Sequence, residues 1–168
     1  MNTKEMKTTI IVTVIIVAAI GGLIWWGSGK QAPPVQDTGE ISALTTPSNL
    51  YDFGTISMKD GLVTKEFVVS NPTDKDIFVP TLVTSCMCTK AYAVLSDGTT
   101  KGPFGMPSMG YVPPVNATVK AGGNIVVRAV YDPNAHGPAG VGQIDRFIIL
   151  TESSGKSLKL EIKATVTP

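Results

Sequence analysis

The distribution of hydrophobic and polar residues divides the chain into an apolar run near its start and a long region of short segments. Residues 8–26 (TTIIVTVIIVAAIGGLIWW) form a run of 19 residues without a charge. A helix needs about 20 such residues to cross the hydrocarbon core of a bilayer. Two lysines within residues 1–7 favour a cytoplasmic start, whereas Trp25 and Trp26 end the run with rings that prefer the membrane interface. The pattern predicts a transmembrane helix over residues 8–26.

A cleaved signal peptide is the alternative interpretation of this run. Its apolar core is usually about 7–15 residues long and is followed by a cleavage site of the Ala-x-Ala type. Here the run is longer, and the sequence that follows it, GSGK, is a poor cleavage site. The comparison favours an uncleaved signal anchor. Residues 27–48 are rich in Gly, Pro, Ser and Thr, and we expect them to form a flexible linker.

Residues 49–168 show short β-type runs between turn signals, without a long amphipathic helical pattern. The last run alternates apolar with polar residues, which is the period of a strand with one buried face. Its apolar members are Leu158, Leu160, Ile162, Ala164 and Val166. We therefore expect an all-β domain over residues 49–168, an immunoglobulin-like β-sandwich of about seven strands.

The other predicted strands of the domain have turn residues at their ends. They cover residues 50–56, 63–70, 76–85, 125–131 and 144–151. Pro80 lies inside one of them and indicates an edge strand or a bulge, because proline has no N–H for the sheet. The region from residue 90 to residue 115 is less regular, although Asp97-Gly98 within it marks a hairpin turn.

Two segments rich in Gly and Pro are predicted to be long loops. The first, residues 102–111, carries Met106 and Met109, and the second, residues 132–140, carries His136, the only histidine of the chain. Loops at the end of a rigid sandwich are where binding groups concentrate. These three side chains are therefore candidates for a binding site.

Cys86 and Cys88 are the only cysteines, two residues apart at the end of a predicted strand. In a strand, both side chains would lie on one face, with α-carbons about 6.6 Å apart at a rise of roughly 3.3 Å per residue. Three interpretations stay open. The cysteines are small buried side chains, a disulfide near the upper limit of the usual Cα–Cα distance, or ligands of a metal.

The metal interpretation draws soft ligands from three parts of the chain. Thiolate and thioether groups select Cu(I), and an imidazole suits copper or zinc. The candidate ligands are Cys86, Cys88, Met106, Met109 and His136. Cu(I) is the candidate cofactor of such a site, and His136 as the third ligand would make the site more tolerant of Zn(II).

Charge and motif content argue against two other classes of function. The chain has 14 Lys and Arg against 13 Asp and Glu, without the clustered cations that nucleic-acid binding requires. No Gly-x-Ser-x-Gly elbow and no Gly-rich phosphate loop with Lys occurs, and His136 would have to serve any catalytic triad. We expect neither an enzyme nor a small-molecule substrate.

Several short motifs occur in a fixed order along the chain. They are Tyr51-Asp52-Phe53-Gly54-Thr55-Ile56, Phe67 with Asn71, Ser85-Cys86-Met87-Cys88-Thr89, Tyr131-Asp132-Pro133 and the closing alternating strand. In this order they resemble the bacterial family catalogued as domain of unknown function 1573, over roughly residues 49–167. The resemblance implies an exported or membrane-tethered immunoglobulin-like domain, similar to the sandwich modules of ciliary and centrosomal proteins. That family usually has Gly between the cysteines, where this chain has Met87.

The anchor and the fold together define the expected function. A single-pass protein with a cytoplasmic N-terminus would hold its sandwich domain outside the cytoplasm, at the cell surface or in the periplasm. We expect a membrane-tethered interaction or scaffold module, with the membrane as one partner and another extracytoplasmic protein as a second. The alternative is a Cu(I)-binding or carrier protein that uses the Cys-x-Cys motif with loop Met and His.

Overall fold

The computed structural model describes residues 12–17 and 40–168 of the chain. Residues 12–17 are α-helical. The rest of the predicted transmembrane helix, the predicted cytoplasmic segment 1–7 and residues 27–39 of the predicted linker lie outside the described residues. Among the helices that are described, none has both the length and the apolar character needed to span a membrane.

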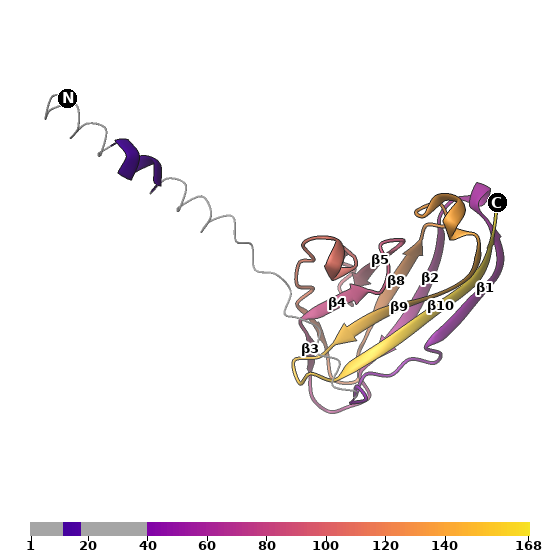
Figure 1. Ribbon diagram of the computed structural model, residues 1–168. Helices are drawn as coiled ribbons and strands as arrows, with labels where there is room; N and C mark the ends of the chain where they lie inside the picture. Colours follow the sequence, from indigo (N-terminus) through magenta and orange to yellow (C-terminus); the bar gives the residue numbers. More distant parts are fainter. Residues whose placement is uncertain (1–11, 18–39) are drawn as a thin grey trace, which may run out of the picture. The chain divides into compact units, whose positions relative to one another are not determined.

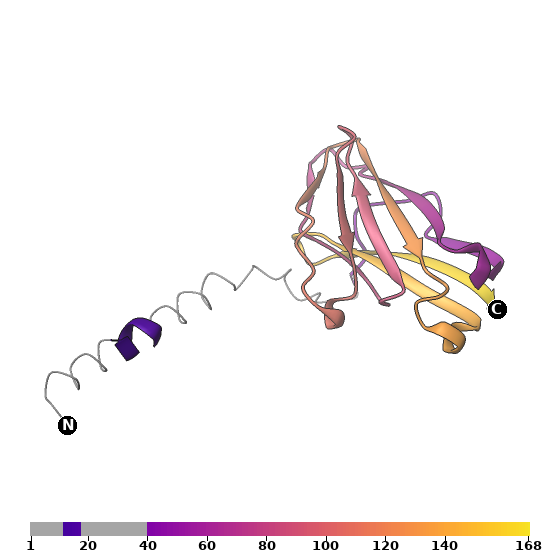
Figure 2. The same ribbon diagram turned by 90° about the horizontal axis from the view of Figure 1, so that it is seen from above.

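Two four-stranded β-sheets form the domain, and they lie as two layers (Figures 1 and 2). The first sheet has the order β1 (Leu50–Ser57), β10 (Ser157–Thr167), β9 (Gly142–Thr151) and β4 (Thr81–Thr84). The second has the order β2 (Val63–Ser70), β8 (Asn124–Tyr131), β5 (Thr89–Val94) and β6 (Thr100–Phe104). A separate pair consists of β3 (Ile77–Val79) and β7 (Ala117–Val119). The predicted β-sandwich is confirmed, with ten strands in the described residues instead of about seven.

The alternation of the last predicted strand corresponds to the buried face of β10. Leu160 and Ile162 are fully buried, and Val166 is 1% exposed. β10 pairs antiparallel with β9 and parallel with β1, so it lies in the interior of its sheet. Its apolar side chains pack in the core between the sheets, as the period of two predicts.

The predicted strand over residues 76–85 is divided at Pro80. The part before the proline is β3, which pairs with β7, and the part after it is β4, which pairs with β9 at the edge of the first sheet. Pro80 still accepts a hydrogen bond at its carbonyl from the backbone N–H of Val115, at 2.9 Å. The chain changes its pairing partner here because proline offers no N–H to continue the ladder.

The region predicted to be irregular contains the hairpin of β5 and β6. Its turn includes Gly98 at φ +83°, and the Asp97 carboxylate accepts a hydrogen bond from the N–H of Thr99 at 2.8 Å. The hairpin signal is therefore confirmed, but the loop predicted from residue 102 begins only after Phe104. The composition of β6, TKGPF, is poor in β-formers, and its pairing with β5 prevails over local propensity.

Residues 40–48, the described part of the predicted linker, pack against the sandwich. Ser42 and Leu44 are 7% and 2% exposed, and Thr45 exchanges backbone hydrogen bonds with Ser70 at 2.9 and 2.8 Å. The carboxylate of Glu152, in the turn between β9 and β10, accepts hydrogen bonds from the Ser42 hydroxyl and from the N–H of Ala43. Ordered structure thus begins before Asn49, because these contacts offset the entropy of ordering a polar segment.

Candidate functional site

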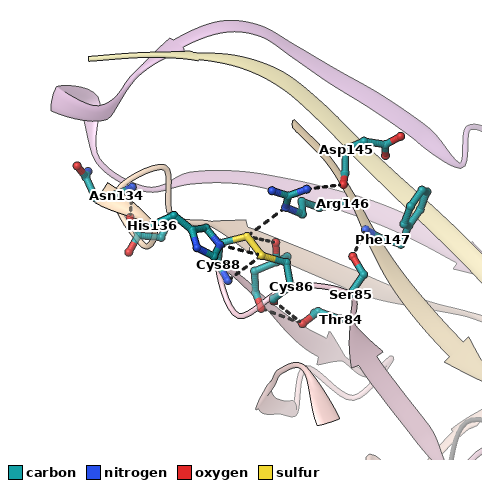
Figure 3. Close-up of a disulfide and its surroundings, with 11 residues drawn as sticks. Thr84, Ser85, Cys86, Cys88, Asn134, His136, Asp145, Arg146 and Phe147 are labelled. Carbon is teal, nitrogen blue, oxygen red and sulfur yellow. Dashed lines mark hydrogen bonds between the residues drawn. A yellow bond between two sulfur atoms is a disulfide. The ribbon is translucent and has the colours of Figure 1, made fainter. Parts of the chain in front are cut away.

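Cys86 and Cys88 form a disulfide in the turn between β4 and β5 (Figure 3). The strand ends at Thr84, so the expectation that both cysteines lie in extended backbone is wrong. The backbone turns between them, and their α-carbons are 5.2 Å apart, well inside the usual range for disulfides. Of the three interpretations of the cysteine pair, the structure agrees with the disulfide.

Hydrogen bonds from three elements hold this turn in place. The Thr84 hydroxyl lies 3.0 Å from the carbonyl oxygens of both Cys86 and Thr89. The N–H of Ser85 donates to the carbonyl of Phe147 in β9 at 3.0 Å, and the Cys88 carbonyl accepts from the N–H of Asp132 at 2.8 Å. The disulfide therefore lies where the chain crosses from the first sheet to the second, with Cys86 9% and Cys88 2% exposed.

Each sulfur contacts a nitrogen from a different element (Figure 3). His136 Nε2, in the loop between β8 and β9, lies 3.3 Å from Cys86 Sγ. Arg146 Nε, in β9, donates to Cys88 Sγ at 3.3 Å. The backbone N–H of Cys88 also lies 3.3 Å from Cys86 Sγ. Cys88 Sγ thus has the guanidinium cation beside it, and Cys86 Sγ has a backbone N–H and an imidazole nitrogen.

Arg146 is a functional candidate that sequence reasoning missed. It lies on the same face of β9 as Ile144, Ile148 and Leu150, which are all buried, so it occupies an inward-facing position and is itself half-buried. Its Nη1 donates to the carbonyl of Asp145 at 2.9 Å, and among the described residues no carboxylate forms an ion pair with it. A lone cation in the apolar face of a predicted strand is the sequence signal that would have revealed it.

Arg146 lies close enough to the buried Tyr131 to influence the ionisation of its phenol. Tyr131, at the end of β8, is 1% exposed. Burial raises the pKa of its phenol above the ordinary value, and the charge of Arg146 opposes part of that shift.

The structure brings together three of the five predicted ligands. The ligand atoms of Cys86, Cys88 and His136 all lie within 4.8 Å of one another. Met106 and Met109 lie in the segment after β6, where Met109 belongs to the 3-10 helix η2 (Pro107–Met109) and is 60% exposed. Metal binding by either thioether stays a prediction.

A second candidate site is a groove of about 270 Å³ between β1 and β2. Three apolar side chains that line it are partly exposed: Leu50 at 42%, Tyr51 at 38% and Val68 at 43%. Lys65 Nζ lies 4.2 Å from the centre of the Tyr51 ring. The groove is the meeting place of the outer strands of the two sheets.

The chain matches no protein-family model and no curated protein. Among solved structures, a protein of unknown function from Porphyromonas gingivalis W83 aligns with 79% of this chain and 50% of its own, at 13% identity and a TM-score of 0.53. A family 123 glycoside hydrolase from Clostridium perfringens aligns with 70% of this chain and 22% of its own, at 9% identity and a TM-score of 0.50.

At these identities the likeness extends to the fold alone, and this chain spans about half the length of the Porphyromonas protein. A PapD-like domain of human CEP192 also aligns, over 84% of this chain and 96% of its own, with 12% identity and a TM-score of 0.44. The chain is therefore a β-sandwich domain of a widely used kind. The resemblance to the family of domain of unknown function 1573 stays a prediction.

Proposed function

We propose that this chain is a membrane-tethered, extracytoplasmic interaction module. Its β-sandwich binds an extended segment of a partner protein in the groove between β1 and β2. One observation carries the proposal, namely that an apolar groove is bordered by the outer strands of two different sheets. The anchor over residues 8–26 would keep this groove close to the outer surface of a membrane.

The outer edges of β1 and β2 are open to a further strand. Among the described residues, β1 pairs with β10 alone, and β2 pairs with β8 apart from the isolated bridge between Thr45 and Ser70. Unpaired N–H and C=O groups along a strand edge are a template for an added strand. An extended peptide that pairs there would turn alternate side chains into the groove, where they bury apolar surface.

The groove also indicates the composition of its ligand. Its partly exposed side chains Leu50, Tyr51 and Val68 are apolar, and Lys65 has no carboxylate partner among the described residues. We therefore expect alternating apolar residues in the bound segment, with an acidic residue beside Lys65. Pockets for alternate side chains are the usual source of specificity in strand addition.

A peptide selection tests this function. The full chain, purified in detergent micelles, is used to select ten-residue peptides from a random display library. We expect alternating apolar peptides, and we expect Val68→Lys to weaken their binding by about tenfold or more, because ~1.4 kcal/mol is a factor of ten. The control is Val141→Lys, since Val141 is 44% exposed, as Val68 is at 43%, and does not line the groove. Equal binding by both variants would refute the groove as the site.

Cu(I) binding by the reduced cysteines is a second candidate function. The observation that favours it is the convergence of Cys86, Cys88 and His136 within 4.8 Å. Two thiolates and an imidazole are a soft donor set that suits Cu(I). Two thiolates with one Cu(I) carry a net charge of −1, which the guanidinium of Arg146 beside Cys88 would balance. The same guanidinium disfavours a divalent cation.

The reduced full chain is titrated anaerobically with Cu(I) against a competing chelator. We expect submicromolar affinity, about 8 kcal/mol or more, that Cys86→Ser or Cys88→Ser removes. Replacement of both Met106 and Met109 by Leu, compared with His136→Gln, identifies the third ligand. Binding by the wild type that is no tighter than that of a double-serine variant would contradict this candidate.

A further inference from the structure

The disulfide of Cys86 and Cys88 has features that chain stabilisation does not require. Its two cysteines are only two positions apart in the sequence, and the stabilisation that a disulfide provides by loop closure becomes smaller as the closed loop becomes shorter. The domain also has an extensive apolar core of its own. A half-buried cation is nevertheless directed at one sulfur, and a histidine lies beside the other. These groups suit a bond that breaks and re-forms.

We propose that Cys86 and Cys88 form a thiol–disulfide exchange centre that oxidises thiols of a partner. In the first step a partner thiolate attacks Cys86 Sγ, the S–S bond breaks, and its electron pair leaves on Cys88 Sγ. The product is a mixed disulfide between Cys86 and the partner, with Cys88 as a thiolate. This chemistry is independent of the binding groove and of copper.

A second partner thiolate completes the reaction. It attacks the partner sulfur of the mixed disulfide, and the electron pair of that bond leaves on Cys86. Two partner thiols become one disulfide, the cysteine pair gains two electrons, and the two protons of the thiols pass to Cys86 and Cys88 through solvent. The reverse sequence reduces a partner disulfide.

Arg146 determines which sulfur leaves first. Its Nε–H donates to Cys88 Sγ at 3.3 Å, so the guanidinium stabilises negative charge that develops on that sulfur. Exchange is faster when the leaving thiolate is stabilised. Cys86 Sγ has the neutral N–H of Cys88 and the ring nitrogen Nε2 of His136 at the same distance. Neither of these groups is a permanent cation, and a hydrogen bond from a charged donor is roughly twice as strong.

Exposure points in the same direction. Cys86 is 9% exposed and Cys88 is 2% exposed, so the sulfur that is attacked belongs to the more accessible residue. Met87 between them is 41% exposed and offers a partner chain an apolar contact beside the reacting sulfur. His136 is an exposed loop residue whose Nε2 lies 3.3 Å from Cys86 Sγ, so it forms part of the surface that a partner thiol would approach.

Glutathione serves as the probe, and it acts on the oxidised full chain in detergent micelles. The reaction is stopped at short times with N-ethylmaleimide, and the modified cysteines are identified by tandem mass spectrometry. We expect glutathione on Cys86 and maleimide on Cys88. A mixed disulfide found mainly on Cys88, or equally on both cysteines, would overturn the assigned direction of exchange.

Substitution of Arg146 tests the role of the charge. Arg146→Met should slow the formation of the mixed disulfide by about tenfold or more, because its leaving thiolate lacks the cation. Arg146→Lys should restore part of the rate. Arg128→Met is the matched control, since Arg128 lies in β8 and pairs with Glu66 at 2.8 Å, away from the cysteines. It should react as the wild type does.

If Arg146 only stabilises the fold, its substitution should change folding and not the rate of exchange with glutathione in variants that fold. Circular dichroism establishes whether each variant is folded, and Arg146→Gln replaces the methionine variant if that one is not. If folded variants without the charge exchange with glutathione as fast as the wild type, the disulfide is structural only and the proposal fails.

Discussion

Arg146 makes the cysteine pair electrostatically asymmetric. A guanidinium on the inner face of β9 contacts one sulfur, while a loop imidazole contacts the other. Arg146 is half-buried on the otherwise apolar face of this strand, and no carboxylate among the described residues forms an ion pair with it. A charged residue at such a position departs from the alternation of apolar and polar residues along the strand, and departures of this kind are expected at functional sites.

Leu160 provides a residue-level test of the core. It is fully buried on the inner face of β10, so Leu160→Ala should lower the free energy of unfolding by about 2–5 kcal/mol through lost burial and a cavity. Denaturant unfolding monitored by circular dichroism measures the change. Thr165→Ala, at an exposed position of the same strand, is the control and should change stability by less than about 0.5 kcal/mol. Equal losses would mean that the face of β10 is misassigned.

Tyr131 should make stability depend on alkaline pH. Burial raises the pKa of its phenol in the folded protein, so the unfolded chain loses this proton first as the pH rises. The contribution is fully present below the ordinary pKa of 10.0 and is lost as the pH rises through the raised value. Urea unfolding between about pH 8 and pH 11 measures this loss. Tyr131→Phe should show a smaller decline than the wild type, and parallel curves would contradict the raised pKa.

At the scale of elements, the strands that could be predicted are those with β-branched residues in a period of two. β2, β8, β9 and β10 belong to this group. The sequence does not reveal β5, β6 and β7, because the first contains two small alanines, the second contains Gly and Pro, and the third has three residues. These strands form because a neighbouring strand supplies hydrogen bonds and burial, which are non-local effects.

The candidate site was predictable to a similar extent. The cysteine spacing identified the pair, and loop placement identified His136 as a candidate ligand. The turn that brings the α-carbons to 5.2 Å was not foreseen, because the arithmetic assumed an extended backbone. The contact of Arg146 with Cys88 could not be predicted, because the alternation along β9 shows which face a residue occupies but not which distant residue it contacts.

The segment before β1 depends on one carboxylate for its attachment. Glu152 is 6% exposed and accepts hydrogen bonds from the Ser42 hydroxyl and the Ala43 N–H. Glu152→Ala leaves these donors without a buried acceptor, which typically costs about 1–3 kcal/mol. We expect amide hydrogen exchange at Leu44 and Thr45 to increase by about tenfold or more.

The control for this attachment is Glu40→Ala. Glu40 is exposed, and its carboxylate lies 3.9 Å from Lys156 Nζ, a geometry that contributes little at a surface. Exchange at Leu44 in this variant should match the wild type. Glu152→Gln keeps one acceptor oxygen and should give an intermediate rate. Unchanged exchange in Glu152→Ala would mean that other contacts hold the segment.

At the scale of the whole molecule, the proposed topology is testable with protease. If residues 8–26 span the membrane with the N-terminus inside, protease added to intact cells, or to spheroplasts where an outer membrane exists, should remove the sandwich domain. Deletion of residues 8–26 should leave a domain that the same treatment spares until the cells are lysed. A domain that is protected in the full chain would rule out the extracytoplasmic assignment.

The parallel pairing of β1 with β10 has a consequence for how the protein is made. Leu50 lies opposite Glu161, so the two strands are side by side in the sheet but far apart in the sequence (Figure 1). At about 5–20 residues per second, translation of the intervening chain takes roughly 5–20 s. During that time β1 has no partner, and the first sheet lacks β10, the strand that joins β1 to β9. The first sheet therefore cannot be completed until the last strand of the chain has been synthesised.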